Sequence, residues 1–265
     1  MKYNRRVAWF SAGVSSAVAI RLAIADIDDV IYIHIDDQHP DTLRFVHECG
    51  EWFGQPITCL QSQYKSVGRV ITESPQRGYI NGPHGATCTR LLKKFVRKEW
   101  EQSHPEYYPI EYVWGMDANE THRAERIRHT MIEFGHRFPL IEKGIGKAEA
   151  HEILRASGIK RPAMYELGYH NNNCVGCVKG GMGYWNKIRV DFPSVFEARA
   201  KLEREVGASC INGVYLDELE PTRGRHAPPI VDECGILCEL QQLPSVQSGT
   251  LAEMKSDSQR GLFLL

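Results

Sequence analysis

The stretch RVAWFSAGVSS, residues 6–16, decides the fold that we predict for this chain. Its first five residues form a short apolar run of the kind that makes a buried strand. The next residues are small, and Val14, Val18 and Leu22 then recur at the spacing of one face of a helix. The stretch therefore predicts a strand, a tight loop and a helix in direct succession.

The same alternation continues along the chain. The β-branched run at residues 30–35 predicts a second strand, and Pro40 opens a helix that we expect to reach about Phe53. Further strands are expected at 56–60 and 112–116, with a helix over 89–100 between them. Alternating strands and helices imply right-handed crossovers, so we predict an α/β fold in which helices flank a parallel, Rossmann-like sheet.

Composition narrows the class of protein. The 265 residues include 32 Lys plus Arg against 33 Asp plus Glu, which gives a net charge of −1. This balance excludes a protein that binds nucleic acid nonspecifically through a large overall positive charge. No apolar run approaches the ~20 residues that cross a bilayer, so we expect no membrane partner. Eight irregularly spaced cysteines in a chain of this size favour a reducing, cytoplasmic location with metal or redox thiols. A secretory signal at the basic, apolar start is the less favoured alternative, since Arg21 interrupts it.

The loop after the first strand is a candidate anion site. In open α/β sheets, ligands bind beyond the carboxyl ends of the strands, where helix amides point. Small residues let the backbone approach a phosphate or sulfate, and hydroxyls can donate to its oxygens. The loop consists of Ser11, Ala12, Gly13, Val14, Ser15 and Ser16. An ordinary tight turn with a serine cap explains the hexapeptide equally well, and neither a Walker A loop nor GxGxxG occurs.

The cysteines include a pair with metal-ligand spacing. Cys174 and Cys177 form a CxxC motif, whose thiols can share a metal ion or cluster or form a redox disulfide. Cys88 opens the predicted helix at 89–100, where we expect the helix dipole to lower its pKa. Cys234 and Cys238 could instead complete a structural zinc site with the CxxC pair. The gap of 234 − 177 = 57 residues is, however, longer than the ~15–20 residues of a compact zinc ribbon. Three others are expected to be small buried hydrophobic residues: Cys49, Cys59 and Cys210.

Taken in order, these motifs resemble the phosphoadenosine phosphosulfate (PAPS) reductase-like family of the adenine nucleotide alpha hydrolase-like (PP-loop) superfamily. The loop is similar to the superfamily's pyrophosphate-binding SGGxDS, with Ala12 in place of a glycine and Ser15 in place of the aspartate. Residues 36–42 resemble the stretch near the ribose and adenine in these reductases. The resemblance implies an adenine nucleotide at the loop and Asp36, and the missing aspartate favours a sulfonucleotide over ATP.

The resemblance also implies a cofactor. The segment from Thr87 to Lys93 is similar to the Cys-Cys-x-x-x-Lys segment of iron–sulfur adenylylsulfate reductases, with Thr87 in place of one cysteine. Cys88, Cys174 and Cys177 would then be three ligands of a 4Fe-4S cluster. Cys234 or Cys238 could supply the fourth ligand, or one iron could stay open as in certain thiolases.

Two further segments match the family. Residues 233–236, Glu-Cys-Gly-Ile, resemble the reductase signature Glu-Cys-Gly-Leu-His, which implies that Cys234 is the catalytic nucleophile, although the histidine is lost here. The segment after the fourth strand resembles Gly-x-Arg-x-x-Glu-x-x-x-Arg, which implies that Arg123 or Arg126 binds an anionic ligand. A solvated, salt-bridged helix with Asn119 as its cap is the plainer interpretation of that segment.

The function implied is that of an iron–sulfur sulfonucleotide reductase-like enzyme, which binds PAPS or APS as its small-molecule substrate and a thioredoxin-type protein as reductant. The alternatives are an ATP-dependent PP-loop thiolase that modifies tRNA or DNA, and a zinc-stabilised nucleotide-binding module. We expect a nucleotide-binding α/β domain at 1–140, a cysteine-containing helical and loop region at 141–244 that completes the active site, and a loose tail at 245–265.

Overall fold

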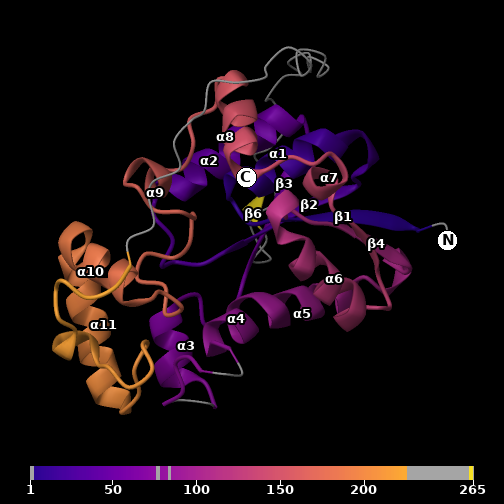
Figure 1. Ribbon diagram of the computed structural model, residues 1–265. Helices are drawn as coiled ribbons and strands as arrows, with labels where there is room; N and C mark the ends of the chain where they lie inside the picture. Colours follow the sequence, from indigo (N-terminus) through magenta and orange to yellow (C-terminus); the bar gives the residue numbers. More distant parts are fainter. Residues whose placement is uncertain (1–2, 76–77, 83–84, 226–262, 265) are drawn as a thin grey trace.

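The computed structural model describes residues 3–75, 78–82, 85–225 and 263–264 (Figure 1). Its sheet has the order β5-β4-β1-β2-β3-β6; β1 to β5 run parallel, and β6 is antiparallel to β3. The strands are β1 (Arg5–Phe10), β2 (Asp29–His34), β3 (Ile57–Gln61), β4 (Ile110–Val113), β5 (Gly135–Arg137) and β6 (Phe263–Leu264). The predicted α/β fold with a parallel sheet is confirmed.

Helices occupy the crossovers, and further helices follow β5 in the described part of the chain. The α-helices are α1 (Val14–Ala23), α2 (Asp41–Phe53), α3 (Val67–Glu73), α4 (Thr87–Thr89), α5 (Phe95–Ser103), α6 (Thr121–Thr130), α7 (Pro139–Glu142), α8 (Lys147–Ala156), α9 (Ala163–Glu166), α10 (Met182–Asp191) and α11 (Pro193–Val206). Short 3-10 turns are η1 (Ile24–Asp26), η3 (Pro105–Tyr107), η4 (Ala118–Glu120) and η5 (Leu216–Glu218). The π-helical turn η2 (Arg90–Lys94) joins α4 to α5, so one helical stretch contains Cys88 near its start.

Alternating side chains of the strands fill two cores, one on each face of the sheet. Ala8 and Phe10 of β1 pack with buried residues of α1, α2 and α8. Val7, which points to the opposite face, belongs to a cluster with Tyr112 of β4 and Trp100 of α5. Figure 1 shows α1, α2 and α8 on one side of the sheet and α5 and α6 on the other. Both faces are covered, as a parallel sheet requires.

A third cluster lies beside the sheet and contains α3, α10 and α11 (Figure 1). Trp185 and Ile188 of α10 are fully buried in it, together with Val70 of α3. Cys88 and Cys174 are partly buried and pack against the same cluster. This packing brings the cysteine-containing loop after residue 170 next to the helical stretch that begins at α4.

Three local expectations need correction. The strand predicted at 112–116 is β4, which ends at Val113, because the next residues turn toward the sheet edge as a loop. The helix that follows is capped by Asp117 rather than Asn119, since the Asp117 carboxylate accepts from the Asn119 N–H and forms a capping box with Glu120. β5 was not expected, because Gly-His-Arg has no apolar pattern that would indicate a strand, yet it pairs in parallel with β4.

The N-terminal segment that could be interpreted as a secretory signal forms β1 and α1, and Val14, Ala17 and Val18 are fully buried there. Across the described parts of the chain, no helix is both long enough and apolar enough to span a membrane.

Candidate functional site

The loop after β1 lies where the strand order reverses. β1 has β2 on one side and β4 on the other, and α/β sheets bind ligands at such a switch point. Ala12 adopts a left-handed backbone, φ 56°, and the Ser16 hydroxyl donates to the Gly13 carbonyl at 2.8 Å. The Ser11 hydroxyl lies 2.8 Å from the Ser16 hydroxyl, and the Ser11 N–H donates to the same oxygen. The hexapeptide is therefore a tight, internally bonded turn at the expected place.

Gly115, which follows β4, contacts this turn directly. A Cβ atom on Gly115 would lie 2.3 Å from the Ser16 Cα, closer than any side chain allows. Only glycine lets the loop after β4 pass this close to the start of α1. Gly115 was not among the predicted site residues, although a glycine just beyond the end of a strand often indicates a close backbone approach.

Asn172, which is 160 residues from Ala12 in the sequence, holds the same turn by a hydrogen bond. Its side-chain amide donates to the Ala12 carbonyl at 2.7 Å and also bonds the Thr42 hydroxyl. Tyr165 approaches from the same side, and its hydroxyl accepts from the Val14 N–H at 3.4 Å. Burial raises the pKa of Tyr165, so this hydroxyl stays neutral. Residues that follow α8 thus complete the environment of the loop after β1.

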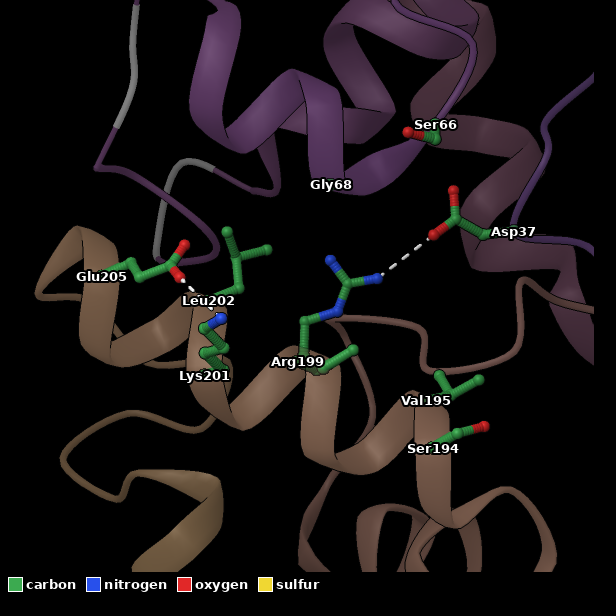
Figure 2. Close-up of a pocket in the computed structure, with 10 residues that line it drawn as sticks. Asp37, Ser66, Gly68, Ser194, Val195, Arg199, Lys201, Leu202 and Glu205 are labelled. Atoms are coloured by element: carbon green, nitrogen blue, oxygen red, sulfur yellow. Dashed lines mark hydrogen bonds and ion pairs between the residues drawn. The ribbon is translucent and has the colours of Figure 1, made fainter.

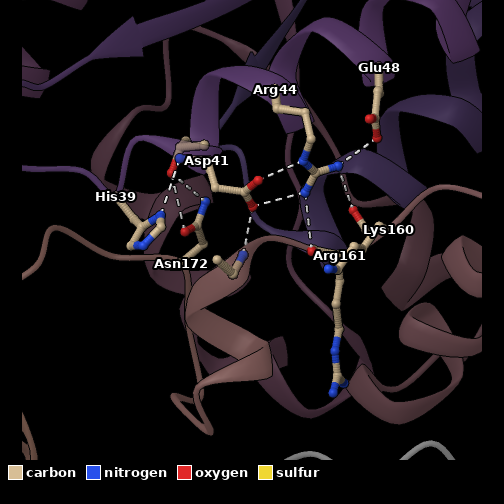
Figure 3. A network of polar contacts seen from close by, with 9 residues as sticks. His39, Asp41, Arg44, Glu48, Lys160, Arg161 and Asn172 are labelled. Atoms are coloured by element: carbon tan, nitrogen blue, oxygen red, sulfur yellow. Dashed lines mark hydrogen bonds and ion pairs between the residues drawn. The ribbon is translucent and has the colours of Figure 1, made fainter. Parts of the chain in front are cut away.

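The start of α2 is fixed to the same region by an ionic network (Figure 3). The Arg44 guanidinium forms two hydrogen bonds to the Asp41 carboxylate and donates to the carbonyls of Lys160 and Arg161. Asp41 also accepts from the Ala163 N–H at 2.8 Å. The hydrogen bond from Arg44 holds the pKa of Asp41 below its usual range, so the network stays ionised at neutral pH.

The two aspartates after β2 have different roles. Asp36 is half exposed and accepts from the Gln61 amide at 2.7 Å, so it lies at the carboxyl edge of the sheet as expected. Asp37 is mostly buried and accepts from the Val67 N–H at 2.7 Å and from Arg199 at 3.2 Å. Asp37 therefore ties the end of β2 to α3 and α11.

The two arginines expected to bind an anion lie on α6. Both Arg123 and Arg126 are exposed, and Arg123 forms an ion pair with Glu120. α6 follows β4, the strand next to β1, so it begins near the switch point. The structure shows the salt-bridged helix, and the contact between these arginines and a ligand stays a prediction.

The CxxC loop is attached to the segment after β2. Gln38 forms a β-bridge with Cys174, and the Val175 N–H donates to the Asp37 carbonyl at 2.8 Å. The Tyr184 hydroxyl accepts from the Cys177 N–H at 2.8 Å and donates to the Cys174 carbonyl at 3.0 Å. Both cysteines are therefore held in place by backbone contacts, and their thiols take no part in these bonds.

Cys88, Cys174 and Cys177 lie within electrostatic range of one another. The Cys177 thiol raises the pKa of both Cys88 and Cys174, and Cys88 raises that of Cys174. Burial is the larger cause in each case and raises the pKa of Cys174 to about 12. The lowered pKa expected for Cys88 is therefore wrong for the free thiol: burial outweighs the opposing effect of the nearby cations, which include Lys93. A metal that bound Cys88 and Cys174 would have to displace the protons of their thiols.

Within the described ranges, no three His, Cys, Asp or Glu side chains converge as ligands of a single ion. Cys234, the predicted nucleophile, and Cys238 lie outside the described residues, so the structure places neither of them.

A pocket of about 440 Å³ opens between the start of α3 and α11 (Figure 2). Asp37, Ser66, Ser194 and Lys201 contribute to its polar lining. Arg199 extends from α11 into this space toward Asp37, as Figure 2 shows, and is only 5% exposed. Its Nε and Nη1 atoms are buried without a hydrogen-bond partner among the described residues. Leaving buried N–H groups without hydrogen bonds is costly, so these two atoms could donate to an acceptor group of a ligand in the pocket.

The remaining described cysteines are buried as predicted: Cys49, Cys59 and Cys210. Burial raises the pKa of Cys210, and the buried Glu203 carboxylate raises it further, while Arg199 lowers it. The interpretation of Cys210 as a hydrophobic residue alone therefore omits its neighbours.

Comparison with known proteins adds no family: no protein-family model and no curated protein matches this sequence.

Proposed function

We propose that this chain is a nucleotide-dependent sulfur-chemistry enzyme of the sulfonucleotide reductase type, with a 4Fe-4S cluster held by Cys88, Cys174 and Cys177. The main support for this proposal is the path of residues 172–177, which contact both strand ends before they reach the CxxC thiols. Asn172 bonds the turn after β1 and Val175 bonds the segment after β2, and the two thiols of the CxxC motif follow at once.

This course limits how far the thiols lie from a nucleotide. Five residues of extended chain span at most about 17 Å, and Asn172 itself touches Ala12. A ligand whose phosphate or sulfate lies on the turn at residues 11–16 would therefore have the cysteine loop as its neighbour. Asp36 lies at the same sheet edge, in the place where the ribose would lie.

The donor set and its surroundings fit a thiolate-bound centre. The thiols of Cys88, Cys174 and Cys177, on two separate segments, lie within electrostatic range of one another, and soft thiolate ligands select iron–sulfur clusters or zinc. Arg199 supplies unpaired N–H groups in the same region, and a cluster with thiolate ligands carries the negative charge that they lack. When bound, the cluster would supply an electrostatic field beside the substrate's sulfonate.

Different residues of the chain would bind the substrate and attack its sulfur. The backbone and hydroxyls of residues 11–16 would bind the anionic end of PAPS or APS and orient its sulfur. The Cys234 thiolate would attack that sulfur, forming a thiosulfonate on the enzyme and releasing the adenosine phosphate with the electrons of the broken S–O bond. A thiol of a thioredoxin-type reductant would then attack Cys234, release sulfite and leave a disulfide that a second thiol reduces.

The test is the metal content of anaerobically purified, full-length protein. We expect iron and acid-labile sulfide with visible absorbance in the wild type, and loss of both in Cys88→Ser, Cys174→Ser and Cys177→Ser, because a serine alkoxide is a poor ligand for iron. Cys49→Ser is the matched control, since Cys49 is buried in the core of the sheet away from the other three. Full iron in Cys88→Ser would refute the assignment.

A further inference from the structure

Positive charge is concentrated on one segment of a chain whose overall charge is −1. Residues 74–98 contain six Lys or Arg and no Asp or Glu. All but one of these six belong to the continuous helical stretch formed by α4, η2 and α5. The balance of charge over the whole chain therefore hides a local excess of cations on this stretch.

The helical stretch has two opposite faces. One face is apolar and buried, with residues spaced four apart: Leu92, Val96 and Trp100. The other face is exposed and consists of Arg90, Lys94 and Lys98, which are also spaced four apart. The two sets are offset by two residues, about half a helical turn, so the three cations point away from the protein. We call these three residues the basic face.

The basic face has no acidic partner in the described part of the chain. Elsewhere, arginines on exposed helix surfaces pair with carboxylates, as Arg69 does with Glu73. On this stretch, the ion pair that forms among the described residues joins Arg97, which is mostly buried, to Glu101 at 3.1 Å. The charges of the basic face are thus available to a partner that brings its own negative charge.

An exposed aromatic ring lies among these cations. Phe95 is 46% exposed, and the Arg90 guanidinium lies 6.0 Å from the centre of its ring. Proteins that bind single-stranded nucleic acid combine cations, which bind the phosphates, with aromatic rings on which bases stack. The basic face and Phe95 provide both kinds of group on one exposed surface.

The spacing of the cations fits an extended polyanion better than a small ion. Four helical residues rise about 6 Å, so Arg90 and Lys98 lie about 12 Å apart along the helix axis. Cations in such a row do not converge on one phosphate, but each can neutralise a different phosphate of a nucleic-acid backbone. An acidic protein surface could meet the charges, yet it would offer no base to stack on Phe95.

We propose that the basic face and Phe95 form a binding surface for single-stranded nucleic acid. The three cations contact successive phosphates, and the Phe95 ring stacks on an unpaired base. The surface shares its helical stretch with Cys88, but it requires neither the cluster nor the sulfonucleotide of the proposed function.

The experiment measures the binding of the full-length protein to fluorescently labelled single strands by anisotropy. The probes are oligothymidylate and oligouridylate of about 20 nucleotides, longer than the ~4–16 that a single-strand site typically covers. We expect binding at low salt, with a slope of log K against log salt of about −2 for three phosphate contacts. Binding of either probe supports the proposal, and the tighter one shows whether DNA or RNA is preferred. No binding of either probe at low salt would overturn it and favour an acidic protein as the partner.

Charge reversal locates the surface. The double variant Lys94→Glu, Lys98→Glu should weaken binding at least about tenfold and reduce the salt slope, because two phosphate contacts are lost. The control Lys143→Glu, Lys160→Glu changes the net charge equally at exposed positions outside this stretch and should keep the wild-type affinity. Equal weakening in both double variants would mean that net charge alone governs binding, and would overturn the assignment to the basic face.

Substitution of Phe95 tests the stacking. Phe95→Ala should weaken single-strand binding about fivefold or more without a change in the salt slope, whereas Phe95→Tyr should retain the wild-type affinity. Because these side chains are exposed, thermal unfolding of every variant should match that of the wild type. Wild-type affinity in Phe95→Ala, or equally tight binding of a duplex, would overturn the single-strand assignment.

The outcome is separate from that of the proposed function. If the wild type binds the oligonucleotides but takes up neither iron nor sulfide, this inference stands and the proposed function fails. If it takes up iron but binds no oligonucleotide, the proposed function stands and this inference fails.

Discussion

The side-chain amide of Asn172 donates a hydrogen bond of 2.7 Å to the carbonyl oxygen of Ala12, although the two residues are 160 positions apart. Ala12 has a left-handed backbone, which disfavours residues other than glycine by roughly 1–2 kcal/mol. The bond therefore helps to hold the turn after β1 in a conformation that Ala12 alone would avoid. It also links that turn to the loop that contains Cys174.

We expect Asn172→Ala to destabilise the protein and weaken nucleotide binding together. The substitution leaves the buried Ala12 carbonyl and the Thr42 hydroxyl without their partner, at a cost of about 1–3 kcal/mol in the free energy of unfolding. Urea unfolding and calorimetric titration with adenosine 3′,5′-bisphosphate would measure the two effects. Asn173→Ala, an exposed neighbour, should leave both values unchanged.

Glycine-to-alanine substitutions at two positions should have opposite effects. Gly115→Ala places a methyl group against the Ser16 backbone and should cost roughly 1–3 kcal/mol or more, because backbone there cannot move aside without distorting the turn. Gly68→Ala, in α3, meets no atom within 4 Å and should raise stability by up to about 1 kcal/mol. Thermal and urea unfolding of both variants would reveal the difference, and an unaffected Gly115→Ala would contradict the close contact.

His151 should make stability depend on pH below neutrality. It is 2% exposed, and burial, with Arg161 and Lys147 nearby, lowers its pKa to about 4, against 6.5 for a free histidine. Between these values the unfolded chain binds a proton that the folded chain excludes, so the free energy of unfolding must fall as the pH drops from about 6.5 to about 4. The loss from this group is at most about 3 kcal/mol.

His151→Gln tests this prediction, because glutamine has no proton to gain in this range. Urea unfolding at pH 7.5 and pH 5 should show a smaller decrease in stability for the variant than for the wild type. An identical decrease in both proteins would mean that His151 is not the group responsible.

Ligand preference should follow the residue at position 15. If the proposed resemblance to PP-loop enzymes holds, Ser15 replaces their aspartate, so we expect adenosine 3′,5′-bisphosphate to bind more tightly than magnesium ATP, as calorimetry can measure. Ser15→Asp should weaken the bisphosphate by about tenfold or more through repulsion of like charges. Tight, magnesium-dependent ATP binding by the wild type would instead favour an ATP-dependent thiolase acting on tRNA or DNA.

Some features follow from the sequence alone because they are local. The apolar run at residues 6–10, the small residues after it and the spacing of Val14, Val18 and Leu22 predict β1, its turn and α1, which the structure has in that order. The CxxC motif likewise brings two thiols close by its spacing alone. Such patterns depend on neighbours in the chain, which the sequence lists directly.

Other features depend on contacts between distant segments, and only the tertiary structure decides them. β5 exists because β4 offers a free edge, and Gly115 is needed because Ser16 lies against it. Cys210 is predicted to be one more buried hydrophobic residue, and only the tertiary structure shows that Glu203 of α11 accepts a hydrogen bond from its N–H. Burial, too, sets the sign of the Cys88 pKa shift, since the loss of water around a thiol depends on everything packed over it.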